Sequence, residues 1–165
     1  MKRILTTLSL LLLTISFVFA QQAPKSPRIT SKDKNIEISY GQPSKRGRVI
    51  FGEVVPYGEV WRTGANEATE ITFKKDAMFG GQPVKAGTYT LFTIPNKTEW
   101  TVILNKQLKQ WGAYDYEKIK DKNVLEVKVP VRSLTAVQEK LTIAAKPDTV
   151  KLEWDQTGIS VPVKF

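Results

Sequence analysis

Residues 87–104 read GTYTLFTIPNKTEWTVIL, and this stretch decides the fold. In residues 87–94, aromatic and aliphatic side chains alternate with threonines, which is typical of a β-strand and places Tyr89 on the face opposite Phe92. A Pro-Asn-Lys turn then leads into a second β-rich run at residues 100–104. Two such runs separated by a short turn predict an antiparallel hairpin.

The same pattern continues on both sides of this hairpin. Short apolar runs bounded by turn residues predict further strands at residues 36–40, 69–73, 77–79, 82–84, 124–129, 140–144, 149–154 and 159–165. Gly80 and Gly81 predict a tight turn, and Asp-Gln-Thr-Gly at residues 155–158 predicts another. Only residues 115–122 have a helical pattern. We therefore expect an all-β fold with one antiparallel β-sandwich over residues 28–165, jelly-roll-like as first choice and immunoglobulin-like as second.

The N-terminus has the composition of a targeting segment. Two basic residues are followed by an apolar run at residues 4–19, and Val-Phe-Ala ends this run at Ala20. This arrangement predicts a cleaved signal peptide at residues 1–20, an exported protein that is periplasmic or secreted, and no membrane span after cleavage. Residues 21–27 contain two prolines and no periodic apolar pattern, so we expect a short flexible lead there.

The charge balance is basic but dispersed. The chain of 165 residues has 25 Lys and Arg against 16 Asp and Glu, a formal net charge of +9. Lysines are spread along the whole sequence, which indicates a solubilising surface, and export argues against nucleic acid as a partner. The one tight basic cluster is Lys-Arg-Gly-Arg at residues 45–48. A solvated turn is the preferred interpretation of this cluster, and a docking point for an anionic group is the alternative.

The chain contains no histidine and no cysteine, which excludes most catalytic classes. The usual general base near neutral pH, the Ser-His and Cys-His nucleophile pairs and the preferred zinc ligands are all missing. No calcium-loop or phosphate-cradling motif is present, so we expect no metal and no cofactor. The exception is a glycoside hydrolase that uses carboxylates alone, for which Glu53, Glu59 and Glu67 are the candidates.

Residues 56–69, PYGEVWRTGANEAT, form the segment with the densest mixture of aromatic, charged and turn-forming residues. Aromatic faces and directional hydrogen-bonding groups suit a small polar ligand or a glycan. The candidate ligand-binding residues are Tyr57, Trp61, Arg62, Asn66, Glu67, Trp111 and Tyr114.

Each candidate also has a structural interpretation. Trp61 is favoured as a core residue, as are the strand residues Trp100 and Trp154. Arg62 has an alternative role as an ion-pair partner of Glu67 or Glu70, which would brace the loop. On this purely structural interpretation, the segment only closes one end of the sandwich. A non-catalytic binding or envelope-associated module is the preferred function.

Several segments also follow the pattern of a known family. They are YGQPS at residues 40–44, VPYG at 55–58, VWRTGANEAT at 60–69, AGTY at 86–89, LFTIP at 91–95 and QWG at 110–112. With these motifs the chain resembles the exported bacterial family catalogued as domain of unknown function twenty-nine-eleven. The resemblance covers nearly all of the chain after the leader. It implies a secreted or periplasmic single β domain and no particular activity.

Overall fold

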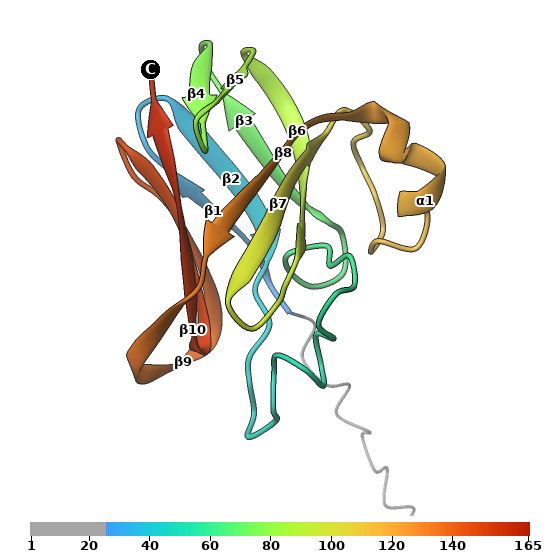
Figure 1. The fold of residues 1–165 in the computed structure, drawn as a ribbon, viewed down its shortest axis with the longest axis vertical. Coiled ribbons are helices and arrows are strands. Elements are labelled where there is room, and N and C mark those ends of the chain that lie inside the picture. The colour runs from blue at the N-terminus through green and yellow to red at the C-terminus, as the bar shows by residue number, and fades with distance from the viewer. Residues whose placement is uncertain (1–25) are drawn as a thin grey trace, which may run out of the picture.

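The computed structural model describes residues 26–165, and these fold into two antiparallel β-sheets that pack face to face (Figure 1). The predicted signal peptide and most of the predicted flexible lead lie outside the described residues. The strands are β1 (Arg28–Lys32), β2 (Ile36–Gly41), β3 (Thr69–Phe73), β4 (Ala77–Phe79), β5 (Gln82–Val84), β6 (Gly87–Ile94), β7 (Glu99–Asn105), β8 (Asn123–Pro130), β9 (Arg132–Ala145) and β10 (Thr149–Lys164).

The larger sheet has the order β1-β2-β3-β6-β7-β8 and the smaller one has the order β5-β4-β10-β9. The hairpin predicted from residues 87–104 is confirmed, since β6 pairs with β7 and Thr93 lies opposite Val102. The tight turn at Gly80 and Gly81 is also confirmed, because it joins the paired strands β4 and β5. The predicted all-β sandwich is therefore the fold.

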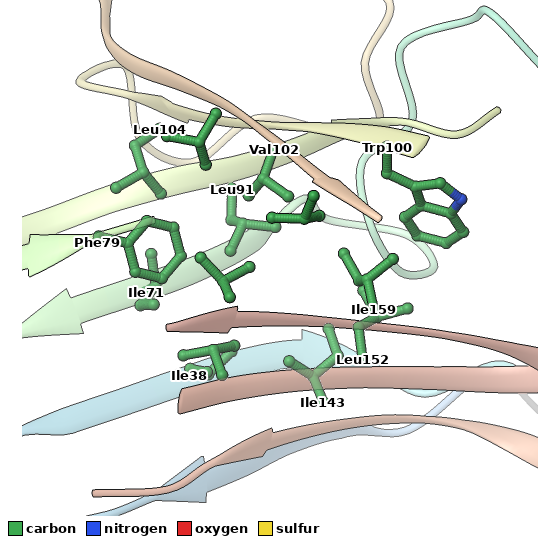
Figure 2. Packing of buried hydrophobic residues seen from close by; sticks show 14 of the residues in the cluster. Ile38, Ile71, Phe79, Leu91, Trp100, Val102, Leu104, Ile143, Leu152 and Ile159 are labelled. Carbon is green, nitrogen blue, oxygen red and sulfur yellow. The ribbon is translucent and has the colours of Figure 1, made fainter. Parts of the chain in front are cut away.

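The main core lies between the two sheets, where alternate residues of each strand point inward (Figure 2). Leu91 and Val102 from the larger sheet lie across the core from Ile143 and Leu152 of the smaller one. A second, smaller cluster covers the outer face of β6 and β7, where Phe92, Ile103 and the short helix α1 (Tyr116–Ile119) pack together. A 3-10 turn at Lys120–Lys122 follows this helix, so the helical pattern at residues 115–122 is confirmed. No helix within residues 26–165 has the length and apolar character needed to cross a bilayer.

The prediction of a turn at residues 155–158 is wrong. Strand β10 runs through this segment without reversing, and the local signal instead marks an irregularity in its pairing with β9. The register shifts on both sides of Asp155, which has a positive φ of 56°. Turn-forming residues also suit a β-bulge, which accounts for the misreading. Strand β9 likewise begins at Arg132, well before the predicted residue 140.

The two sheets are also joined along the edge of β9. The phenol of Tyr40 accepts a hydrogen bond from the Ile143 N–H at 3.0 Å, and the Ser31 hydroxyl accepts one from the Ala145 N–H at 3.0 Å. Burial raises the pKa of the Tyr40 phenol, and the bond from the Ile143 N–H opposes this effect only in part. These contacts fix β1 and β2 against β9.

Candidate functional site

The segment at residues 60–69 is tied to the end of strand β6. Trp61 and Thr93 exchange both backbone hydrogen bonds, at 2.7 and 3.0 Å, and form an isolated antiparallel bridge. The chain then reverses through Thr63 and Asn66, which have positive φ values of 56° and 63°. A β-branched residue rarely adopts this conformation, so Thr63 marks local backbone strain.

Threonine side chains hold this turn in place. The buried Thr63 hydroxyl lies 3.0 Å from the Thr93 hydroxyl, and the Thr69 hydroxyl donates to the Thr63 carbonyl at 2.8 Å. The indole N–H of Trp61 donates to the Gly64 carbonyl at 3.2 Å. The Ala65 N–H donates to the Gly41 carbonyl at 3.2 Å. The turn is therefore braced by hydroxyls, an indole and backbone groups.

The ring of Trp61 belongs to an aromatic cluster in the core. It is only 8% exposed, so the expectation that Trp61 is a core residue is confirmed. Its ring is stacked on Trp154, with centroids 6.0 Å apart and planes at 18°, and it meets Phe51 and Trp100 edge-on. Trp100 and Trp154 are buried as well, as their strand positions predict.

Beside this cluster the surface is hollowed into a pocket of about 230 Å³, which we call the Trp61 pocket. Its walls come from segments far apart in the chain, because Ser26 ahead of β1, residues that follow β2, the braced turn and β10 all contribute. The residues that matter here are Pro43, Arg48, Val54, Trp61, Arg62 and Trp154. No acidic residue lines the pocket, and its two charged residues are both arginines.

Arg62 does not brace the turn. Its Nε atom is buried and has no hydrogen-bond partner among residues 26–165, and its guanidinium forms no ion pair within them. The ion pair considered from the sequence, with Glu67 or Glu70, is not formed. The Glu67 carboxylate instead lies 3.9 Å from Arg28, and the Glu70 carboxylate accepts the Lys109 N–H at 2.9 Å.

Arg48 also lines this pocket, although it is not among the site residues predicted from the sequence. Its Nε donates to the Lys45 carbonyl at 3.0 Å and its Nη2 donates to the Ser44 carbonyl at 2.8 Å. These acceptors fix the guanidinium without neutralising it, and Arg48 has no carboxylate partner within the described part of the chain. In the sequence, Arg48 is marked only by the basic cluster at residues 45–48, for which a solvated turn is the preferred interpretation.

The other predicted site residues lie elsewhere on the surface. Glu67 and Trp111 form an isolated bridge, and the Gly112 N–H donates to the Asn66 carbonyl at 3.0 Å. Trp111 is 62% exposed and Tyr114 is 79% exposed, and neither lines the Trp61 pocket. Tyr57, Asn66 and Glu67 do not line it either. The structure therefore brings Trp61 and Arg62 together in one pocket and separates them from the other five candidates.

Glu53, Glu59 and Glu67 are all exposed, and none of them lines the Trp61 pocket. Within residues 26–165, no group of three or more potential metal ligands comes together.

Comparison with protein families finds that the model described as "Protein of unknown function (DUF2911)" matches residues 23–163. The corresponding searches of curated proteins and of solved structures find no match.

Proposed function

We propose that this protein, which belongs to the DUF2911 family, is a non-catalytic ligand-binding module whose binding site is the Trp61 pocket. The observation that carries the proposal is Arg62. This arginine lines an open pocket with a buried Nε that has no acceptor among residues 26–165. Buried donors are nearly always satisfied in folded proteins, so an unpartnered donor calls for an explanation. Trp100 Nε1 is likewise without a partner among residues 26–165, but Arg62 lines the Trp61 pocket and Trp100 does not, so a ligand in this pocket would supply the acceptor for Arg62.

The local backbone supports the same proposal. Thr63 follows Arg62 directly and is held in a strained conformation by the hydrogen bonds of its hydroxyl and carbonyl. Strain of this kind persists where the surrounding structure fixes it, and it occurs often at binding sites. Because the bracing does not involve the guanidinium, Arg62 is left available for recognition.

We further propose that the protein acts outside the cytoplasm, as an envelope-associated or secreted module. The support is the sequence of residues 1–20, with its basic start, apolar run and small residue at Ala20. N-terminal sequencing of the protein from the periplasm or culture medium is expected to give a chain that begins at Gln21. Retention of Met1 in a cytoplasmic fraction would contradict this part of the proposal.

A ligand screen with a blocked variant tests the binding role. Thermal shift and tryptophan fluorescence are measured with monosaccharides, small organic acids, small amides and cell-envelope fragments. Val54 lines the pocket and is 41% exposed, so Val54→Trp is expected to fill the pocket and remove any response. Val137, which is 52% exposed on β9 and does not line the Trp61 pocket, provides the control Val137→Trp. A screen in which no compound stabilises the protein counts against a binding function and favours the purely structural interpretation.

A further inference from the structure

We infer that the Trp61 pocket takes a small molecule with an oxyanion head, a carboxylate or a phosphate monoester, attached to one short apolar or ring-shaped body. Arg62 is the main counter-charge and Arg48 the second. This inference rests on the proposed binding function and adds the chemical class of the ligand.

The charge of the pocket is the first argument. Two arginines line it without any acidic residue, so a neutral occupant would leave both charges uncompensated. Two carboxylates of neighbouring segments are engaged elsewhere. Asp155 pairs with Lys45 at 2.8 Å, and a side-chain oxygen of Glu139 accepts the Arg46 N–H at 2.8 Å. Within the described chain, neither arginine of the pocket is paired with a carboxylate.

The geometry of the donors is the second argument. A guanidinium binds a carboxylate or phosphate through two parallel N–H groups, and one common pair includes Nε. The Nε of Arg62 is the atom that is buried without an acceptor. An oxyanion placed against this edge of Arg62 would satisfy it, and a charge-assisted bond is stronger there than the bond of a neutral hydroxyl.

The walls of the pocket are the third argument, and they disfavour a neutral sugar. The indole N–H of Trp61 already donates to the Gly64 carbonyl, and that of Trp154 donates to the Glu139 carbonyl at 3.2 Å. Neither tryptophan therefore has a donor left for a sugar hydroxyl. Pro43 and Val54 add apolar surface. More of the pocket lining is polar than apolar, and its charged groups are Arg48 and Arg62, so the pocket suits a charged head that carries only a short apolar or ring-shaped body.

The size of the pocket limits the ligand. Its volume of about 230 Å³ lies below the range of roughly 300–1,000 Å³ that is usual for drug-sized molecules. A single ring with one charged substituent is therefore an appropriate probe. Benzoate and benzamide have nearly the same shape and differ in charge, so they isolate the contribution of the oxyanion. Phenyl phosphate tests the phosphate form, and glucuronate paired with glucose tests a sugar body.

The experiment is titration of the purified protein with these five probes, followed by calorimetry and by tryptophan fluorescence, since Trp61 and Trp154 line the pocket. We expect benzoate or phenyl phosphate to bind at least about tenfold more tightly than benzamide, a difference that rising salt reduces. Arg62→Met should remove this preference while keeping an unbranched apolar chain close to the length of the arginine stem. Arg132→Met is the matched control, because Arg132 is paired with Glu153 and does not line the pocket.

The outcomes separate the two proposals. Benzamide or glucose binding as tightly as its charged counterpart, with loss of binding in Val54→Trp, overturns the oxyanion inference and supports the binding function. An oxyanion preference that survives in Arg62→Met also overturns the inference, provided that thermal unfolding shows the variant to be folded. Failure of all five probes at millimolar concentration overturns the inference, and the wider ligand screen then decides the binding function independently.

Discussion

Two pockets of this protein each contain an arginine, and they differ in how that arginine is satisfied. The Trp61 pocket contains Arg62, which has no ion-pair partner among residues 26–165. A second pocket of about 330 Å³, which we call the Arg132 pocket, is lined by residues 132–136 and 138 with Glu153. There the guanidinium of Arg132 is hydrogen-bonded to the Glu153 carboxylate. The larger pocket is the one whose charge the protein already balances.

Strand β10 contributes one residue to each pocket. Glu153 and Trp154 are consecutive in β10, and successive side chains of a strand point to opposite faces. Trp154 is buried among the core aromatics beside the Trp61 pocket, while Glu153 faces the other way and pairs with Arg132. The two pockets therefore differ in charge balance as well as in volume, and the proposed site is the smaller pocket, whose arginine has no carboxylate partner among residues 26–165.

The largest expected effect on stability comes from removing an aromatic side chain that lines the Trp61 pocket. Trp61→Ala is expected to lower the free energy of unfolding by about 4 kcal/mol, because it deletes a buried aromatic side chain from the core. Leu134→Ala, in the half-buried wall of the Arg132 pocket, should lower it by about 1 kcal/mol. Urea denaturation measures both values. Equal losses would mean that Trp61 is not part of the core packing.

Two glycines give the next contrast. A Cβ at Gly41 would lie 2.1 Å from the backbone oxygen of Ala65, so Gly41→Ala must displace the braced turn and should lower the free energy of unfolding by about 3 kcal/mol. A Cβ at Gly158 would lie 3.1 Å from the guanidinium carbon of Arg132, a side-chain atom that can move aside. Gly158→Ala should therefore change stability by less than about 1 kcal/mol. Thermal unfolding of the two variants provides the measurement, and a small effect of Gly41→Ala would show that the turn next to Arg62 is not rigid.

The hydrogen bond between Tyr40 and Ile143, which joins the two sheets, gives the next prediction. Tyr40→Phe leaves the buried Ile143 N–H without its acceptor and should lower the free energy of unfolding by about 1–2 kcal/mol at neutral pH. The pKa of the Tyr40 phenol is raised in the folded protein, so its protonated form favours folding. The stability that this phenol contributes is complete below the unfolded pKa of about 10 and is lost as pH rises through the folded pKa.

Urea denaturation of the wild type and of Tyr40→Phe between about pH 9 and pH 11 checks this sign. The difference in stability between the two proteins should shrink as the pH rises. A difference that grows in alkali would show that the folded protein favours the ionised phenol.

Much of the fold could be predicted from the sequence because most strands carry their own alternation and turn residues. The hairpin of β6 and β7 is the clearest case. The sequence did not reveal β1, whose residues Arg28–Lys32 alternate between half-buried and exposed positions at the edge of the sheet and so lack a strong apolar pattern. The sequence around Asp155 predicts a turn where the structure has a bulge, because the same residue types serve both conformations.

The site was predictable only in part, because a pocket depends on contacts between distant segments. The sequence predicts Trp61 in the core, which is confirmed, and it selects residues 56–69 as the candidate segment. The sequence alone did not reveal that Arg48 joins Arg62 in one pocket or that Trp111 and Tyr114 lie outside it. Those relations are set by how β2, β6 and β10 meet in three dimensions.

The most direct test of the account is the free energy of unfolding of Arg62→Met compared with that of Arg132→Met, in buffer without organic anions. If the guanidinium of Arg62 is uncompensated, its removal leaves stability unchanged or raises it by up to about 1 kcal/mol. Removal of Arg132 breaks a partly exposed ion pair and should lower stability by up to about 1 kcal/mol. A larger loss for Arg62→Met than for Arg132→Met would show that Arg62 braces the fold and would contradict its assignment to a ligand.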